Sequence, residues 1–146
     1  PDIKYGESAL GREYSKVRDY AEVNRAALRE MHRQVGDLVV DARGIAQRGL
    51  LVRHLVLPDD IAGTEEVLAF LSREISRDTY LNIMDQYHPC YRADEHPPLD
   101  RQVTITELRD AYDLADRYGL HRLDGLSRNA PRPASAGGRD ETRDGA

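Results

Sequence analysis

The sequence predicts an α/β fold in which parallel strands alternate with helices. Its 146 residues provide enough chain for one domain with a hydrophobic core. Apolar segments and segments of helical periodicity follow one another in the order strand, helix, strand, helix, strand, helix, strand. This order is typical of βαβ units, which build a parallel sheet. A closed eight-stranded barrel needs about 250 residues, so four strands correspond to half of one.

The strand pattern is clearest at residues 50–57. This segment is almost entirely apolar, which is typical of a strand covered on both faces. Residues 79–84 are the next predicted strand, and residues 2–4 and 120–124 are candidates for the remaining two. Residues 38–47 are expected to form a small hairpin, because Gly44 suits a turn that needs positive φ.

Three segments predict helices. The first begins at Tyr20, after Asp19 as N-cap with Glu22 three residues later, and stops at Gly36. Its apolar positions keep helical spacing and are Tyr20, Val23, Ala27, Met31 and Val35. The second helix starts at Thr64 and is expected to bury Val67, Leu68, Leu71 and Ile75. The third begins near Thr104 or Thr106 and closes at Gly119; its apolar stripe is Leu108, Ala111, Tyr112, Ala115 and Tyr118.

Composition excludes several classes of function. The formal net charge is -5, which provides no electrostatic footprint for nucleic acid or an anionic membrane. No apolar run approaches the roughly 20 residues of a membrane span. The single cysteine, Cys90, excludes an internal disulfide framework and suits a reducing, cytoplasmic environment. It also cannot hold an iron–sulfur cluster without further ligands.

The chain divides into a structured part and a tail. Residues 1–126 are expected to form the domain, and residues 127–146, which are rich in Arg, Pro, Gly and acidic residues, are expected to be disordered. The sequence opens on Pro1 rather than Met, which suggests a piece of a longer protein.

Charged residues interrupt the predicted strands. Alternation places Asp2 and Lys4 on one face of their strand, where a surface ion pair is the simpler interpretation. Arg53 shares a face with Leu51 and Leu55 and needs an anionic partner, either a ligand or a structural carboxylate. His54 lies on the opposite face, where a hydrogen-bonded core histidine is favoured over a ligand.

The loop after the second clear strand concentrates polar side chains. It reads QYHPCYRADEH from Gln86 to His96. Nitrogen, sulfur and oxygen donors make a zinc site conceivable, but the spacing matches no standard zinc motif. A metal-free binding loop is the favoured interpretation, because binding groups collect in long βα loops. The sequence has neither GxGxxG nor GxxxxGK[ST], so it gives no support for a dinucleotide fold or a P-loop enzyme.

Three stretches together resemble one protein family. They read PDIKYG, EMHRQVGDLVVDARGIAQRGLLVRHLVLPDDIAGTEEVL and YLNIMDQYHPCYRA. They resemble the carboxyl-terminal half of radical S-adenosylmethionine (radical SAM) proteins, specifically those related to pyruvate formate-lyase activating enzyme. The resemblance covers residues 1–124. It implies half of an incomplete, TIM-like (β/α)6 barrel, whose amino-terminal half holds a [4Fe-4S] cluster on a CxxxCxxC loop that this chain lacks.

The resemblance also implies roles for particular residues. Asp2 and Lys4 match the family's D-x-K pair, which meets the amino acid moiety of S-adenosylmethionine. Arg53 matches a further cofactor contact, and His88, with Tyr87 beside it, matches the position near the adenosyl part.

The function implied for the parent protein is reductive cleavage of S-adenosylmethionine followed by hydrogen abstraction. Its expected partners are the missing amino-terminal half of the barrel and a glycyl radical enzyme or another protein substrate. This chain by itself is expected to be inactive. The alternative is a non-catalytic half-barrel that serves as a binding or interaction module.

Overall fold

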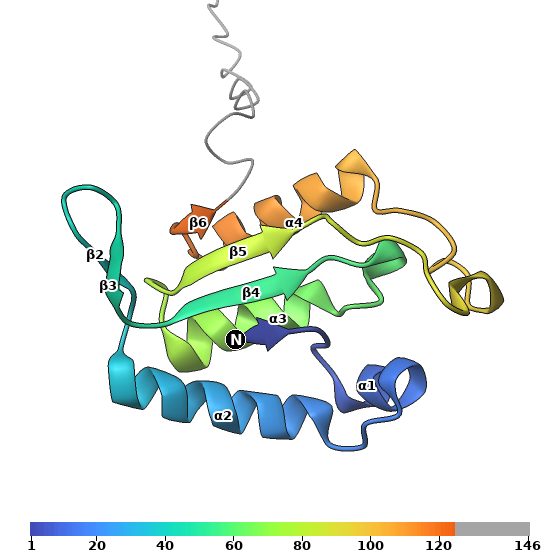
Figure 1. Ribbon diagram of the computed structural model, residues 1–146, viewed down its shortest axis with the longest axis horizontal. Coiled ribbons are helices and arrows are strands. Elements are labelled where there is room, and N and C mark those ends of the chain that lie inside the picture. The colour runs from blue at the N-terminus through green and yellow to red at the C-terminus, as the bar shows by residue number, and fades with distance from the viewer. Residues whose placement is uncertain (125–146) are drawn as a thin grey trace, which may run out of the picture.

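A parallel sheet forms the centre of the molecule (Figure 1). The computed structural model describes residues 1–124, so the predicted tail lies outside the described residues. The sheet has four strands in the order β1-β4-β5-β6. Their bounds are Asp2–Ile3, Leu51–Leu55, Tyr80–Met84 and Leu123–Asp124. All three neighbouring pairs are parallel, which confirms the predicted α/β class.

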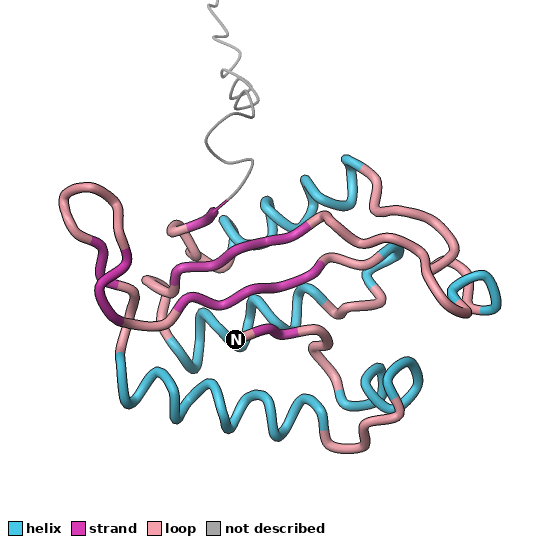
Figure 2. The backbone as a smooth tube through the Cα atoms, in the orientation of Figure 1, coloured by secondary structure: helices cyan, strands magenta, loops and turns pink. Residues whose placement is uncertain are grey.

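The helices connect the strands in chain order. Between β1 and β4 lie α1 (Ser8–Ser15), α2 (Tyr20–Val35) and a hairpin of β2 (Val39–Val40) and β3 (Ala46–Arg48). Between β4 and β5, α3 (Thr64–Phe70) continues into a π-helical turn. Between β5 and β6 lies α4 (Ile105–Arg117), and Figure 2 shows these alternating segments. The order along the sheet never reverses, unlike that of a doubly wound fold.

The core lies on one face of the sheet. Alternate strand residues point into it, namely Ile3, Val52, His54, Leu81 and Ile83. They pack against Leu28 of α2, Val67 and Leu68 of α3, and Leu108, Ala111 and Ala115 of α4. The other face carries Leu51, Arg53, Leu55, Tyr80, Asn82 and Met84, which are half-buried or exposed. We call this second surface the open face.

The open face corrects one expectation. The apolar run at residues 50–57 predicted a strand covered on both faces, whereas β4 alternates between buried and accessible residues. The reason is that, within the described residues, α2, α3 and α4 all pack against the same core.

Helix α2 differs from its prediction in two respects. Asp19 makes no side-chain cap; instead the Ser8 hydroxyl accepts a hydrogen bond from Ala21 N at 2.9 Å and donates one to the Glu22 carboxylate. The cap is therefore tertiary, from the start of α1. The helix also buries Ala21 and Leu28, while Val23, Met31 and Val35 are 65%, 40% and 40% exposed.

The remaining local predictions agree with the structure more closely. Of the two predicted starting points of the last helix, Thr104 is its N-cap and forms a complete capping box with Glu107. In the predicted hairpin, the Asp41 carboxylate accepts from two turn amides and Gly44 adopts φ 79°. Helix α1 was not predicted, because it has only eight residues and its interior includes Gly11, a poor helix former.

Candidate functional site

A row of polar residues crosses the open face. The strand register places Asp2 beside Arg53, Arg53 beside Asn82, and Asn82 beside Asp124. Neighbouring residues in a parallel sheet point to the same side, so all four strands contribute to one row. Alternation in β5 is the signal that could have identified Asn82, because it lies opposite the buried Leu81 and Ile83.

Asp2, Lys4 and Arg53 form an ion cluster in this row. Arg53 donates to both Asp2 carboxylate oxygens, with Nε–Oδ1 at 2.8 Å and Nη2–Oδ2 at 3.3 Å. Lys4 Nζ donates to Oδ2 at 3.0 Å. The Arg53 hydrogen bond, followed by that of Lys4, lowers the pKa of Asp2 to about 2.

The cluster has two cations and one carboxylate, so it carries one surplus positive charge. The Lys4 and Arg53 side chains are 51% and 48% exposed, which leaves their remaining N–H groups accessible. The same contacts match the simpler interpretations of a surface ion pair and of a structural arginine paired with a carboxylate. What distinguishes the cluster is its position on the sheet face opposite the core against which α2, α3 and α4 pack.

His54 is a core residue, as predicted. Its ring is fully buried, with Nδ1 2.8 Å from the Ile3 carbonyl and Nε2 3.1 Å from the Thr64 hydroxyl. A carbonyl only accepts, so Nδ1 carries the proton and Nε2 accepts from Thr64. Burial lowers the pKa of His54 and favours this neutral form.

A cleft of about 500 Å³ lies at the carboxyl ends of β1 and β4. Its wall comes from the end of β1, from α1, from the end of β4 and from the loop after β5. The lining residues include Lys4, Tyr5, Tyr14, Leu55, Leu57, Tyr87, Cys90, Tyr91, His96 and Leu99. In parallel α/β proteins, ligands bind at this end of the strands. Lys4 belongs to both the cleft and the ion cluster, so the two are continuous.

Tyrosines give the cleft its character. The Tyr87 hydroxyl donates to the Leu99 carbonyl at 2.7 Å, which fixes its ring, and burial raises the pKa of Tyr87. The Tyr5 and Ser15 hydroxyls are 2.9 Å apart. Tyr14 meets His96 edge to face, with ring centroids 6.3 Å apart. The cleft therefore combines aromatic surface with the Lys4 ammonium group. Sequence reasoning missed Tyr5 and Tyr14, because α1 was not predicted.

The structure brings the predicted site residues only partly together. Asp2, Lys4 and Arg53 touch one another, and Tyr87 lines the same cleft as Lys4. His88 does not line the cleft; its Nδ1 accepts from Gln102 Nε2 at 2.8 Å.

The loop after β4 is held in an unusual conformation. Asp59 and Asp60 have φ of 51° and 53°, a left-handed region that costs energy for residues with a Cβ. Glu107 of α4 accepts from Asp59 N at 2.8 Å, and Arg101 donates to the Asp59 carboxylate at 2.6 Å. Asp60 accepts from Thr64 N at 2.7 Å and so caps α3. Contacts from distant parts of the chain thus fix this loop.

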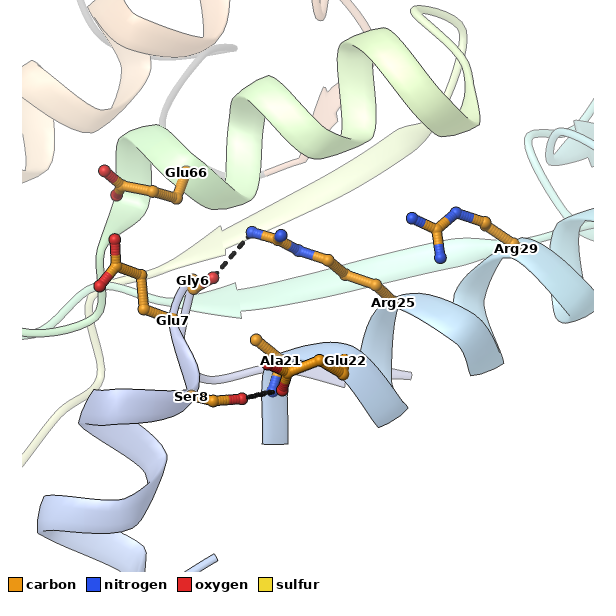
Figure 3. A pocket seen from close by; sticks show the side chains of 8 residues that line it. All are labelled: Gly6, Glu7, Ser8, Ala21, Glu22, Arg25, Arg29 and Glu66. Carbon is orange, nitrogen blue, oxygen red and sulfur yellow. Dashed lines mark hydrogen bonds between the residues drawn. The ribbon is translucent and has the colours of Figure 1, made fainter. Parts of the chain in front are cut away.

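A second cavity has a volume of about 550 Å³ (Figure 3). It is formed by the loop after β1 with α2 and α3, and Gly6, Glu7, Glu22, Arg25, Arg29 and Glu66 line it. Figure 3 shows Arg25 reaching the Gly6 carbonyl, at 2.8 Å. Both arginines also lie over the Phe70 ring. Its lining has three glutamates against two arginines, so it carries no surplus positive charge and is the weaker candidate.

The described part of the chain contains neither a group of side chains arranged as a metal site nor a helix that could span a membrane. Within residues 1–124, no group of three or more His, Cys, Asp or Glu side chains is arranged to hold a metal ion. The loop from Gln86 to His96 therefore offers no support for a zinc site. None of the helices in this range combines the length and apolar character needed to cross a membrane.

Comparison with known proteins identifies one similar chain of undetermined activity. The sequence is 31% identical over 120 residues to the uncharacterized protein MJ0674 of Methanocaldococcus jannaschii. The match covers 82% of this chain and 31% of the relative, so the chain spans about a third of the length of the curated relative it matches. No protein-family model matches the chain, and no solved structure does.

Proposed function

We propose that this chain is a section of a radical SAM protein related to pyruvate formate-lyase activating enzyme, and that its open face is a wall of the barrel lumen. The observation that carries the proposal is the Asp2–Lys4–Arg53 cluster on the sheet face opposite the core that α2, α3 and α4 cover. In the parent protein, the expected activity is reductive cleavage of S-adenosylmethionine and hydrogen abstraction from a glycyl radical enzyme or another substrate.

The winding of the sheet supports the barrel part of the proposal. The strands follow in chain order, and α2, α3 and α4 cover one face. A barrel wall has these two properties, and its inner face meets the ligand. The longer length of the relative agrees with a chain that supplies only part of such a barrel.

The charges of the cluster suit the methionyl end of S-adenosylmethionine. That end has a carboxylate and an ammonium group. The Arg53 fork and Lys4 match the carboxylate, and Asp2 matches the ammonium group. The surplus positive charge of the cluster favours a ligand group with negative charge. Tyr87 would lie beside the adenosyl part in the cleft, while His88 would approach from outside it.

A [4Fe-4S] cluster does not fit this chain. Its usual ligands are several cysteine thiolates, and the sequence has one cysteine, Cys90. We therefore assign no step to iron–sulfur chemistry here. The chain's own residues bind and orient the cofactor, and the cluster would belong to another part of the parent protein.

The alternative is a non-catalytic half-barrel that binds a ligand or another chain. The exposed apolar residues of α2 favour it, because such surfaces mark contacts with partners. The two functions differ in one measurable property, since only the first requires that the ion cluster recognise S-adenosylmethionine.

The test is a titration of S-adenosylmethionine into the wild-type chain, Arg53→Lys and the control Arg48→Lys, with urea midpoints measured in parallel. Arg48 lies on the exposed hairpin. Because Lys replaces a planar fork by a single point charge, we expect Arg53→Lys to weaken binding about ten- to a hundred-fold at an unchanged midpoint. Unchanged affinity with a lowered midpoint would show that Arg53 is structural.

A further inference from the structure

The cleft at the carboxyl ends of β1 and β4 is lined by more residues than the cofactor would use. Lys4 and Tyr87 are the lining residues that would meet S-adenosylmethionine. Further lining comes from the end of α1 and from the loop after β5, and we call this part the outer cleft. It includes Glu13, Tyr14, Lys16, Tyr91, Arg92 and His96. The volume of the whole cleft, about 500 Å³, is in the range of small-molecule sites.

Lys16 gives the outer cleft a cation that forms no ion pair within residues 1–124. It is the C-cap of α1, with φ 59°, and its Nζ donates to the Glu13 carbonyl, a neutral acceptor, at 2.8 Å. Arg92, by contrast, donates from Nε to the Glu95 carboxylate at 2.8 Å. Lys16 is therefore the cation of the outer cleft that can receive an anion without losing another partner.

The balance of charge in the cleft also favours an anion. Among the described residues that line it, Glu13 is the one carboxylate, against the cations Lys4, Lys16 and Arg92. A single accessible ammonium group suits a singly charged carboxylate, whereas a phosphate group carries more charge and more acceptor oxygens. The nearby Glu13 carboxylate would repel a second negative charge.

Tyr14 and Tyr91 supply aromatic surface from two segments. The Tyr14 ring meets the His96 ring edge to face, 6.3 Å between centroids, which joins α1 to the loop after β5. Tyr91 is 93% exposed and has φ 56°, a conformation that costs energy for a residue with a Cβ. Its ring is available to a ligand because it is not packed in a core. Tyrosine rings pack well against other planar rings.

We infer that the outer cleft binds a small aromatic carboxylate, with the carboxylate at the Lys16 ammonium group and the ring against Tyr14 and Tyr91. This inference names the substrate class of the proposed enzyme and therefore rests on the proposed function. It leaves the Asp2–Lys4–Arg53 cluster to the cofactor, because Lys16 supplies a separate cation.

The test compares three probes by NMR titration of the ¹⁵N-labelled full chain without S-adenosylmethionine. The probes are phenylacetate, its uncharged analogue phenylacetamide, and acetate, which lacks the ring. We expect phenylacetate to saturate with a dissociation constant of about 1–10 mM and to shift the amides of Tyr14, Lys16 and Tyr91. Phenylacetamide should bind about ten-fold more weakly, and acetate should give no saturable shifts. Equal binding of phenylacetate and phenylacetamide, saturable binding of acetate, or no saturable binding of phenylacetate would overturn the inference.

Two variants and a matched control test the residues. Lys16→Met should weaken phenylacetate binding about ten-fold, whereas Arg33→Met, which removes the same charge from a side chain of α2 that is 71% exposed, should leave it unchanged. Tyr91→Ala should weaken binding about five-fold; its exposure keeps the fold intact, so this variant and the three probes decide if Lys16→Met disturbs α1. Wild-type affinity in either cleft variant, or an equal loss in Arg33→Met, would show that the outer cleft is not the site.

A parallel titration with S-adenosylmethionine separates this inference from the proposed function. Binding of phenylacetate without binding of S-adenosylmethionine would overturn the proposed function and leave the cleft as a site for aromatic carboxylates in a protein of another class. Binding of S-adenosylmethionine without binding of phenylacetate would overturn the present inference alone.

Discussion

Arg53 is tolerated in the middle of a strand because its side chain lies on the open face. Its neighbours Val52 and His54 point into the core, whereas the guanidinium stays about half exposed and meets Asp2. A buried charge would need full compensation, but a half-exposed one keeps much of its hydration. The strand can therefore present a fixed cation without a large loss of stability.

Asp2→Asn should change how stability depends on acid. The pKa of Asp2 is lowered to about 2, chiefly by the Arg53 hydrogen bond, so the carboxylate stabilises the fold above its ordinary pKa near 4. That contribution disappears as the pH falls from about 4 to about 2. We expect the variant to lose stability less steeply over this range in urea unfolding at a series of pH values. Because the pair is partly exposed, the effect is small. An identical acid slope in both proteins would contradict the ion cluster.

His54→Asn should reveal the buried neutral histidine. Burial lowers the pKa of His54, so the unfolded chain binds a proton below about pH 6.5 that the folded chain does not. The contribution of His54 to the free energy of unfolding is thus fully present above about pH 6.5 and declines as the pH falls below this value. The variant should lose about 2–4 kcal/mol at neutral pH and flatten the curve of stability against pH below about pH 6.5. His88→Asn, at an exposed position, is the control; an unchanged slope in His54→Asn would refute the assignment.

The helices show what sequence patterns can and cannot locate. The start of α4 near Thr104 was predictable, and the capping box that Thr104 forms with Glu107 is a contact between neighbours in the chain. The cap of α2 was not, because Ser8 is thirteen residues from Ala21 and belongs to an unpredicted helix. Apolar spacing likewise predicted α2 but did not identify its buried side. Leu28 lies in the core, whereas Val23 and Met31, which belong to the predicted apolar positions, are exposed.

Alanine substitutions at two positions of α2 should distinguish its faces. Leu28→Ala removes a fully buried side chain and should cost about 2–5 kcal/mol, because a cavity remains. Met31→Ala, three residues later, should change the stability by no more than about 0.5 kcal/mol. Chemical denaturation of both variants provides the comparison. If both variants lost the same stability, Met31 would belong to this chain's own core.

The parallel sheet was predictable from the sequence, whereas the site was predictable only in part. Strand alternation placed Asp2, Lys4 and Arg53 on particular faces, and the register joined them. The cleft could not be anticipated, because Tyr5, Tyr14 and Tyr87 meet through the packing of α1 and the loop after β5. The sequence also did not show which face of the sheet the helices cover, because an apolar run does not distinguish the two faces.

An NMR titration tests whether the open face binds the cofactor. S-adenosylmethionine is added to millimolar concentration, and the amide chemical shifts of the ¹⁵N-labelled chain are followed. We predict saturable shifts centred on Lys4, Arg53 and Tyr87, because the ion cluster and the cleft form one continuous surface. The amides of Arg25, Arg29 and Glu66, around the cavity on the helix side, should remain unchanged. Shifts confined to that cavity, or no saturable shifts at all, would contradict the assignment of the open face as a cofactor-binding wall.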